Sequence, residues 1–260
     1  MQLNSSTSAI ITGGASGLGQ ATCAMLRAHG VNVALFDRDP RGAEIASRHG
    51  ASFFETDVTS ESAIAASLAQ ARAVQGVERI LVNCAGIVIG KRTISKKRDS
   101  ETFTPHDQAA FATVIGVNLI GSFLMGAQCA AAMAQLDPVT KDGGRGVIIN
   151  TASIAAEDGQ MGQAAYSASK GGVVGMTLPM ARDLAPYGIR VVSIMPGLFE
   201  TPMLASLPDD IRASLEAQIP FPARLGLPEE YAKLVHSIID NDMLNGTSIR
   251  LDGALRMQPK

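Results

Sequence analysis

The stretch Thr12-Gly13-Gly14-Ala15-Ser16-Gly17-Leu18-Gly19 decides the fold. It follows the short apolar run 9–11 and opens residues 17–29, where apolar positions recur at helical spacing until Gly30, a residue suited to a helix end. Glycines in such a turn let the backbone approach a pyrophosphate closely, and the helix N-terminus offers unpaired N–H groups to the anion. A glycine-rich string alone is weak evidence, but its place between a strand and a helix favours a dinucleotide site.

The same alternation of strands and helices continues along the chain. We expect helices at 41–48 and 60–74, and further strands at 31–36, 51–54, 80–82, 146–151, 189–195 and 248–251. The strand cores are continuous apolar runs, as in strands that are buried on both faces of a parallel sheet. The prediction is an α/β chain, with residues 1–260 forming a single doubly wound Rossmann domain. It has a seven-stranded parallel sheet with helices on both faces.

Composition narrows the classes of partner. The net charge of −2 gives no electrostatic reason to expect nucleic acid or a membrane surface, and we see no apolar run long enough to span a bilayer. The spacing of Cys23, Cys84 and Cys129 matches no metal site, so we expect no metal and buried free thiols. Residues 1–8 lack the apolar core of a secretory signal. We therefore expect a cytoplasmic protein in a bacterium, or a mitochondrial matrix protein if the source is eukaryotic and the chain is processed.

An acidic residue follows the glycine-rich turn at the distance that a dinucleotide site requires. Asp37 ends the second predicted strand, where a carboxylate can bind the ribose hydroxyls of NAD and repel the 2′-phosphate of NADP. Arg38 beside it could accommodate that phosphate, and Asp37 could instead be a turn residue before Asp39-Pro40. We predict NAD. Residues 57–58 and 83–86 close two further strands at the edge of the sheet where ligands bind, although either could be a plain turn.

A tyrosine and a lysine suggest the chemistry. Tyr166 and Lys170 stand at i and i+4 on one predicted helical face. A nearby ammonium favours the phenolate and lowers the pKa of a tyrosine from about 10, which suits acid–base catalysis. Ser153 follows the strand at 146–151, where its hydroxyl could bind a substrate oxygen. On spacing alone, the alternative is a surface pair together with a serine that caps a helix.

Taken in order with Asn118 and Pro196-Gly197, these residues resemble the classical short-chain dehydrogenases/reductases over essentially the whole chain. The resemblance implies that Tyr166 is the acid/base, Ser153 orients the substrate oxygen, Lys170 lowers the pKa of the tyrosine and binds the nicotinamide ribose, and Asn118 supports a water-linked proton relay. It implies cofactor contacts at Gly13, Ser16, Gly17, Leu18, Gly19, Asp37, Asp57, Val58, Asn83, Ala85, Gly86, Tyr166, Lys170, Pro196, Gly197, Leu198 and Thr201.

A closer resemblance is to the type II 3-hydroxyacyl-CoA dehydrogenases, a branch that includes hydroxysteroid dehydrogenases of type 10. Six segments carry it: 146–153, 162–166, 176–179, 182–186, 221–222 and 250–253. It implies the NAD-dependent, reversible oxidation of a secondary alcohol, foremost a 3-hydroxyacyl-CoA to a 3-ketoacyl-CoA in fatty acid metabolism. It also implies a homotetramer built through two long helices.

Two long segments lie outside the regular pattern, an insertion at 88–106 and a Pro-rich, apolar segment at 198–227 that we interpret as a substrate lid. The predicted substrate contacts are Ser153, Gln163, Tyr166, Leu204 and Leu207, and the lid residue Phe221 also suits an acyl chain or a steroid. A basic cluster in the insertion could bind the phosphates of coenzyme A or be a solvated loop; its members are Lys91, Arg92, Lys96, Lys97 and Arg98.

Two kinds of alternative stay open. One is another enzyme of this fold, a hydroxysteroid or other secondary-alcohol dehydrogenase, or a 3-oxoacyl-carrier-protein reductase. The reductase usually takes NADPH, against which Asp37 argues. The other is a non-catalytic NAD-binding scaffold, which would have lost Tyr166, Lys170 or Ser153, whereas all three are present.

Overall fold

The computed structural model describes residues 1–96, 101–205 and 208–259. Its main sheet is parallel throughout, and the strand order is β3-β2-β1-β4-β7-β8-β9. The strands are β1 (Ser8–Thr12), β2 (Asn32–Asp37), β3 (Ser52–Glu55), β4 (Ile80–Asn83), β7 (Gly146–Thr151), β8 (Ile189–Pro196) and β9 (Ser248–Leu251). The predicted seven-stranded parallel sheet is confirmed, and each predicted strand lies within about two residues of its observed bounds.

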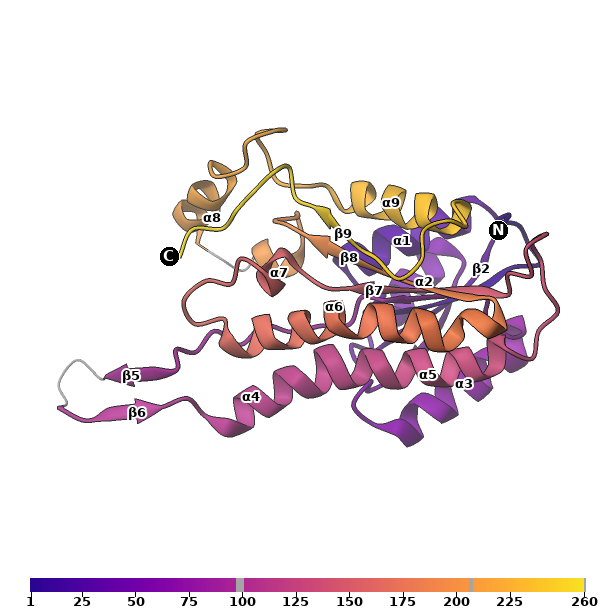
Figure 1. Cartoon of the computed structure of the whole chain (residues 1–260), viewed down its shortest axis with the longest axis horizontal. Helices are drawn as coiled ribbons and strands as arrows, with labels where there is room; N and C mark the ends of the chain where they lie inside the picture. The colour runs from indigo at the N-terminus through magenta and orange to yellow at the C-terminus, as the bar shows by residue number, and fades with distance from the viewer. Residues whose placement is uncertain (97–100, 206–207, 260) are drawn as a thin grey trace.

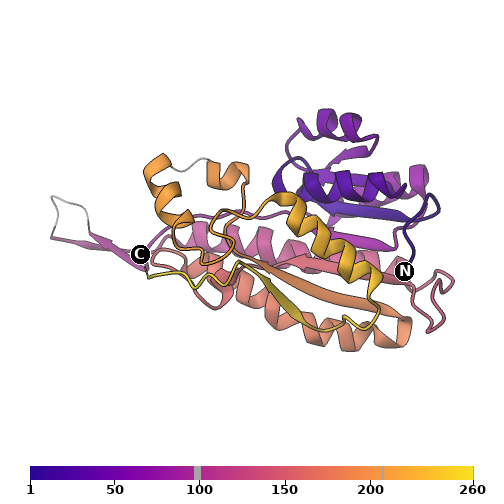
Figure 2. The same ribbon diagram turned by 90° about the horizontal axis from the view of Figure 1, so that it is seen from above.

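Helices cover both faces of this sheet (Figure 1). One face carries α1 (Gly17–Ala28), α2 (Gly42–His49) and α9 (Pro228–Asp240). The other carries α3 (Glu61–Gln75), α4 (Gln108–Ile115), α5 (Ser122–Met133) and α6 (Ala164–Leu184), and Figure 2 shows the two layers with the sheet between them. Ser60 caps α3 as predicted, accepting a hydrogen bond from the N–H of Ala63 at 3.3 Å. Each face therefore has its own apolar core, and the doubly wound architecture is confirmed.

The core follows the alternation of side chains along the strands. Ile11 of β1 and Val82 of β4 face the α1–α9 side, whereas Ile10 and Leu81 face the α3–α6 side, and all four are fully buried. Successive side chains of a strand point to opposite faces, so a sheet covered on both sides needs apolar residues at consecutive positions. This is the physical reason for the continuous apolar runs in the sequence.

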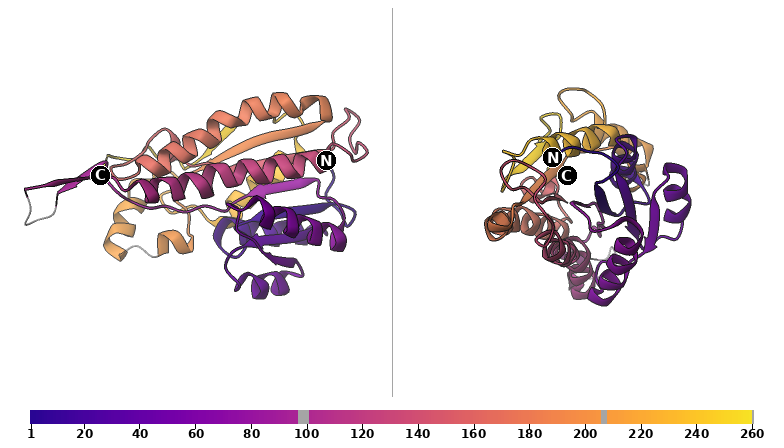
Figure 3. Two further views of the ribbon diagram at one scale, coloured as in Figure 1. Left: turned by 90° about the horizontal axis from the view of Figure 1, so that it is seen from below. Right: turned by 90° about the vertical axis from the view of Figure 1, so that its right-hand side faces the viewer.

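A long helix on the second face has no counterpart among the predicted elements. Helix α4, the π-helical turn η1 (Gly116–Gly121) and α5 form one rod over 108–133, which packs along α6 (Figure 3). By length and composition this is one helix that could cross a membrane, so the expectation that no apolar run is long enough was wrong. Its buried side chains Met125, Cys129 and Met133 belong to the core between this layer and the sheet.

The insertion forms a short antiparallel hairpin, which was predicted only as a long irregular segment. Strands β5 (Ile94–Lys96) and β6 (Phe103–Pro105) pair with Ile94 opposite Pro105, and the hairpin extends away from the sheet (Figure 1). All six residues are exposed, so no buried face marks them as strands in the sequence. The remaining elements are η2 (Ile154–Ala156), η3 (Ala185–Tyr187), α7 (Pro202–Ala205) and α8 (Asp209–Glu216).

The order of the strands fixes where a ligand can bind. From β1 the chain winds outward to β2 and β3, then returns to β4 on the other side of β1 and continues outward to β9. The loops after β1 and β4 therefore leave in opposite directions and open a crevice at the carboxyl edge of the sheet.

Candidate active site

A cavity of about 530 Å³ occupies this crevice. Residues that follow five strands line it, and α6 and the segment after β8 close its sides. Its lining contains all the cofactor residues predicted from the sequence except Asn83, and also Ser153, Gln163 and Leu204 from the predicted catalytic and substrate sets. Residues spread over more than 180 positions of sequence thus converge on one cavity.

The glycine-rich turn forms one end of the cavity. Gly13 has a φ of +65°, and a Cβ added there would lie 2.6 Å from the backbone nitrogen of Ala85, so only glycine fits. A Cβ on Gly19 would lie 2.3 Å from the carbonyl oxygen of Gly13. Ser16 precedes α1 without capping it through its side chain, and the first turn of α1 carries no acidic residue. Its N–H groups are thus left for an anion, which fits a dinucleotide pyrophosphate.

Asp37 lies at the end of β2 and lines the same end of the cavity. One carboxylate oxygen accepts a hydrogen bond from the N–H of Ala15 at 3.0 Å, and the other accepts from the N–H of Asp39 at 3.0 Å. The carboxylate therefore holds the glycine-rich turn in place, a role that the sequence did not predict. Arg38 also lines the cavity. The carboxylate that would repel a 2′-phosphate and the guanidinium that would attract it therefore both lie at the site.

Asn83 is the one predicted cofactor residue that does not line the cavity. Its side chain is buried, and its amide donates to Asn150 Oδ1 at 2.9 Å and to the carbonyl oxygen of Ser122 at 3.2 Å. Its Oδ1 accepts from the hydroxyl of Thr12 at 3.3 Å. The residue therefore ties β1, β4, β7 and α5 together beneath the cavity instead of facing a ligand, because these buried amide groups need partners of their own.

Three of the four predicted catalytic side chains, Ser153, Tyr166 and Lys170, lie together at the other end of the cavity. Tyr166 and Lys170 occupy adjacent turns of α6, and the Lys170 nitrogen lies 5.8 Å from the centre of the tyrosine ring. The Lys170 ammonium donates to the carbonyl oxygen of Thr151 at 2.7 Å. Ser153, which follows β7, forms a hydrogen bond with the Tyr166 hydroxyl, while its Oγ accepts from the N–H of Ala155 at 3.1 Å. The alternative of a surface pair is excluded, because Lys170 is buried and Tyr166 is half-buried.

The electrostatics of this trio differ from the prediction. Burial raises the pKa of Tyr166, and only the hydrogen bond from Ser153 opposes that rise. Burial also lowers the pKa of Lys170 to about 8. The expectation that Lys170 lowers the pKa of the tyrosine is therefore corrected for the protein without cofactor. Desolvation of the phenolate is the larger effect on the pKa of Tyr166, and the Lys170 ammonium donates its hydrogen bond to the carbonyl oxygen of Thr151 instead.

Asn118 stands behind this trio, in the middle of the π-helical turn η1. It is fully buried and does not line the cavity. Its Oδ1 accepts from the N–H of Ile87 at 2.8 Å, and its amide donates to the carbonyl oxygen of Ile87 at 2.9 Å and to the Ser169 hydroxyl at 3.0 Å. A Cβ on Gly86 would lie 3.4 Å from Asn118 Oδ1 and 3.5 Å from Lys170 Nζ, so both side chains pack close to the Gly86 backbone. The side chain of Asn118 thus fixes the loop after β4 to α6, and its part in a proton relay stays a prediction.

The predicted substrate residues are only partly brought together. Gln163 lines the cavity, although its Oε1 accepts from the N–H of Gln160 at 3.0 Å. Leu204 of α7 lines it as well, whereas Leu207 lies outside the described residues. Phe221, the lid residue judged to suit an acyl chain or a steroid, is 83% exposed and does not line the cavity.

Several lining residues were not predicted. Ile154, Leu215 and Met257 add apolar surface near Leu198 and Leu204, and Met257 comes from the C-terminal segment. No local pattern in the sequence reveals where a chain end packs. Cys84 also lines the cavity and is only half-buried, so the prediction of three buried thiols holds for Cys23 and Cys129 alone.

The described part of the basic cluster is exposed and partly neutralised. Lys91 pairs with Asp107 at 2.9 Å and Lys96 with Glu101 at 3.0 Å. The N–H of Lys91 donates to the carbonyl oxygen of Gly162 at 2.9 Å, which ties the insertion to the residue before Gln163. Lys97 and Arg98 lie outside the described residues. Within the described residues, no group of His, Cys, Asp and Glu could hold a metal ion.

Known proteins are similar to this chain in sequence and in fold. A family profile described as short chain dehydrogenase matches residues 7–212. The chain is 53% identical to the 3-hydroxyacyl-CoA dehydrogenase type-2 of Bos taurus and 49% identical to that of Drosophila melanogaster. These alignments cover 96% of this chain and 95% and 97% of the two relatives.

Solved structures agree. A 3-hydroxyacyl-CoA dehydrogenase type-2 from Mycobacterium avium superposes with a TM-score of 0.90 at 39% identity and covers both chains fully. A 3-ketoacyl-(acyl-carrier-protein) reductase from Brucella melitensis, in complex with NADH, gives a TM-score of 0.82 at 29% identity over 96% of this chain and 98% of its own. The chain therefore belongs to the short-chain dehydrogenase family and is an oxidoreductase of secondary alcohols that uses a nicotinamide cofactor.

Proposed function

We propose that this chain catalyses the reversible, NAD-dependent oxidation of a 3-hydroxyacyl-CoA to a 3-ketoacyl-CoA. The observation that carries the proposal is the cavity itself. One end is a glycine turn with an uncapped helix N-terminus, and the other joins Ser153, Tyr166 and Lys170 to an apolar wall. The curated relatives, about half identical over nearly the full chain, act on this substrate class by name.

The residues divide the chemistry between them. When bound, the nicotinamide ring supplies the hydride acceptor or donor for the carbinol carbon. Tyr166, as phenolate, takes the proton of the substrate hydroxyl, and the Ser153 hydroxyl donates a hydrogen bond to the same oxygen. In the reverse direction neutral Tyr166 gives its proton to the carbonyl oxygen. Since burial raises the pKa of Tyr166, the neutral acid prevails at neutral pH in the free protein, and reduction can start without a prior change of protonation.

NAD, as opposed to NADP, is supported by Asp37. Its carboxylate lines the cavity at the end of β2, where the adenosine ribose of a dinucleotide lies in folds of this kind. A 2′-phosphate there would meet a negative charge that two backbone N–H groups hold in place. Among the described residues that line this end of the cavity, Arg38 is the one cation that would favour a 2′-phosphate.

An acyl substrate suits the far end of the cavity. Ile154, Leu198, Leu204, Leu215 and Met257 present an apolar wall beside Ser153 and Tyr166. The thioester end of such a substrate would lead out toward the insertion, where exposed Lys91 and Arg92 could meet the phosphates of coenzyme A. A hydroxysteroid is the second candidate, because the same wall would accept a rigid apolar ring system.

Assembly as a homotetramer is part of the proposal. The outer faces of the long helices expose Phe111, Ile120 and Phe123 on the α4–α5 rod and Leu178 on α6, each between 37% and 49% exposed. The two helices lie side by side, so these side chains form apolar surface on one layer of the protein. Such surface on neighbouring helices is typical of an interface between subunits.

A substrate panel tests the proposal. Formation of NADH would be followed with 3-hydroxybutyryl-CoA, longer 3-hydroxyacyl-CoAs, a hydroxysteroid and simple secondary alcohols, and each would be repeated with NADP. The proposal predicts that a 3-hydroxyacyl-CoA with NAD has the highest kcat/KM. A higher kcat/KM for the steroid would favour the second candidate, and preference for NADP would contradict the cofactor assignment.

A further inference from the structure

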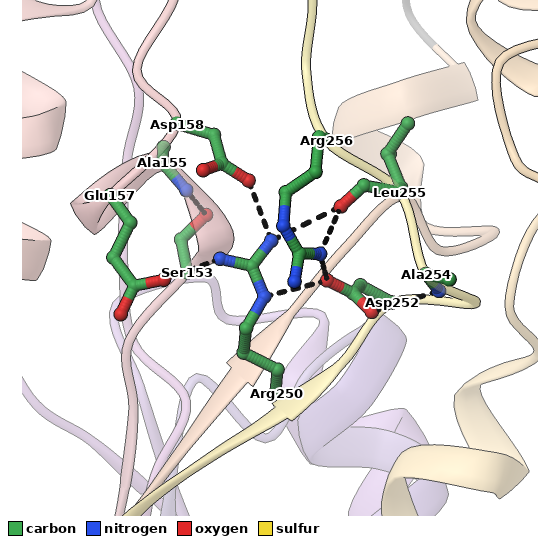
Figure 4. A network of polar contacts seen from close by, with 9 residues as sticks. All are labelled: Ser153, Ala155, Glu157, Asp158, Arg250, Asp252, Ala254, Leu255 and Arg256. Carbon is green, nitrogen blue, oxygen red and sulfur yellow. Dashed lines mark hydrogen bonds and ion pairs between the residues drawn. The ribbon is translucent and has the colours of Figure 1, made fainter.

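Arg250, on β9, is the centre of an ion-pair network outside the cavity. Its side chain is 18% exposed, and its three nitrogens bond to three carboxylates (Figure 4). Nε donates to Asp252 at 2.8 Å, Nη1 to Glu157 at 2.6 Å, and Nη2 to Asp158 at 2.6 Å. Nη2 also donates to the carbonyl oxygen of Leu255 at 3.1 Å. The planar guanidinium therefore uses all its nitrogens to join two chain segments that lie about 90 residues apart in the sequence.

The first segment is the helical turn that begins at the catalytic serine. Ser153 caps η2 by accepting the N–H of Ala155, and the N–H groups of Glu157 and Asp158 both donate to the carbonyl oxygen of Ile154, at 3.0 and 2.9 Å. Residues 153–158 thus form one hydrogen-bonded unit. Because Arg250 holds the two carboxylates at its far end, it constrains the orientation of the Ser153 hydroxyl at the near end.

The second segment is the C-terminal stretch 252–259. Asp252 and Leu255 flank a tight turn in which Gly253 and Ala254 have φ values of +60° and +67°. The second value is strained for a residue with a Cβ. Arg250 bonds to both flanks of this turn. Beyond the turn, Met257 lines the cavity. The N–H of Met161 donates to the carbonyl oxygen of Pro259 at 3.0 Å, and the Gln160 amide donates to that of Gln258 at 2.9 Å.

We propose that Arg250 is a positioning residue for catalysis. It locks the Ser153 turn and the C-terminal stretch 252–259 to each other, so that the Ser153 hydroxyl and the Met257 wall keep a fixed distance across the substrate end of the cavity. None of the residues to which the guanidinium bonds lines the cavity or belongs to the glycine-rich turn. It should therefore act on the alcohol or ketone substrate and leave NADH binding unchanged. The inference rests on the proposed function only for the choice of assay substrate.

Three variants separate this role from a general structural one. Arg250→Met removes every bond of the network, and Arg250→Lys keeps a charge without the planar fork. Arg256→Met is the matched control, because Arg256 also pairs with Asp252, at 3.2 Å, but is 62% exposed and does not bond to the Ser153 turn. Each variant would be compared with wild type for kcat and KM with acetoacetyl-CoA, for the Kd of NADH, and for hydrogen exchange of residues 153–161 and 252–259.

For Arg250→Met we expect kcat/KM to fall at least about tenfold, the scale of a misplaced catalytic group. The Kd of NADH should stay within about twofold of wild type and both segments should exchange faster, with Arg250→Lys between Met and wild type. Arg256→Met should match wild type. Equal kcat/KM in Arg250→Met and Arg256→Met, or a Kd of NADH that rises in parallel with KM, would overturn the proposal.

If Arg250→Met does not fold, Glu157→Gln with Asp158→Asn releases the Ser153 turn while the pair of Arg250 with Asp252 remains, and the same outcomes apply. Failure of the proposed function would be recognised separately, since wild type itself would then be inactive with acetoacetyl-CoA. The exchange of the two segments, and kcat/KM with whichever secondary alcohol wild type oxidises, would still decide the role of Arg250.

Discussion

The ammonium of Lys170 donates a 2.7 Å hydrogen bond to the carbonyl oxygen of Thr151, the last residue of β7. The bond ties the catalytic helix α6 to the centre of the sheet, two residues before Ser153. The hydroxyl of Thr151 in turn lies 2.7 Å from that of Tyr231, a fully buried residue of α9. Lys170 is therefore fixed in position before any cofactor binds, although its burial lowers its pKa to about 8.

The titration of Tyr166 follows from this arrangement. Burial raises the pKa of its hydroxyl, so in the free protein the phenolate should form only above about pH 10, the value of an unperturbed tyrosine. Difference absorbance of tyrosinate between wild type and Tyr166→Phe would measure this pKa. Replacing Ser153 by Ala removes the hydrogen bond that lowers it, and should move the pKa further up. A pKa well below 10 in the protein without cofactor would contradict the assignment.

Asp37 should control the choice of cofactor. Asp37→Ala removes a charged acceptor, so we expect kcat/KM with NAD to fall roughly tenfold or more while the preference for NAD over NADP shrinks, because the repulsion of the 2′-phosphate is lost. Kinetics with both cofactors would check this. Asp39→Ala is the control, since Asp39 pairs with Arg41 and does not line the cavity. An unchanged NAD-to-NADP ratio in Asp37→Ala would show that another residue discriminates.

The insertion offers a test of coenzyme A binding. Arg92→Glu with Lys96→Glu reverses two exposed charges and should raise KM for acetoacetyl-CoA several-fold, less so at high salt. KM for a pantetheine-truncated analogue should not change, because it lacks the nucleotide phosphates. Lys141→Glu with Lys233→Glu changes the net charge equally at exposed positions outside the insertion. Equal changes of KM in the two double variants would show that the basic cluster is a solvated surface that does not bind coenzyme A.

The exposed face of the long helices predicts assembly. Phe123→Glu places a charge in the proposed contact between subunits and should shift the protein from tetramers toward smaller species in light scattering during size-exclusion chromatography. Val74→Glu is the control, since Val74 is 67% exposed on α3 and belongs to neither of the two long helices. A monomeric wild type, or tetramers that persist in Phe123→Glu, would argue against this interface.

The sequence predicted the parts of the fold that periodicity encodes. Apolar runs and glycine turns located all seven strands of the main sheet, because a strand buried on both faces needs consecutive apolar residues. The strands β5 and β6 were not predicted, because all six of their residues are exposed and no apolar alternation marks them. The π-helical turn around Asn118 could not be predicted either. It differs from an α-helix only in that each N–H donates to the carbonyl oxygen five residues earlier instead of four.

The sequence predicted those residues of the site that belong to recognisable motifs. The glycine turn, Asp37, Ser153, Tyr166 and Lys170 all line one cavity. The burial of the Asn83 side chain could not be predicted, because a polar residue at a strand end can face inward as readily as outward. The direction of the pKa shift at Tyr166 depends on whether burial of its hydroxyl, which raises the pKa, exceeds the attraction of a nearby positive charge, which lowers it. The spacing of two residues on a helix carries no information about burial. Met257 lies outside every motif, and the segment 250–253 carried the family resemblance without any predicted role for Arg250. Only the packing of the C-terminal segment brings Met257 to the cavity and joins Arg250 to the Ser153 turn.

The most direct test of the account is the Tyr166→Phe variant, measured for both turnover and cofactor binding. Removing one hydroxyl removes the group that exchanges a proton with the substrate, so we predict that kcat falls by at least about a thousandfold in both directions. The Kd of NADH, measured by fluorescence, should stay within about threefold of wild type, because the glycine turn and Asp37 are untouched. Turnover near the wild-type rate in Tyr166→Phe would contradict the central claim that Tyr166 is the catalytic acid and base.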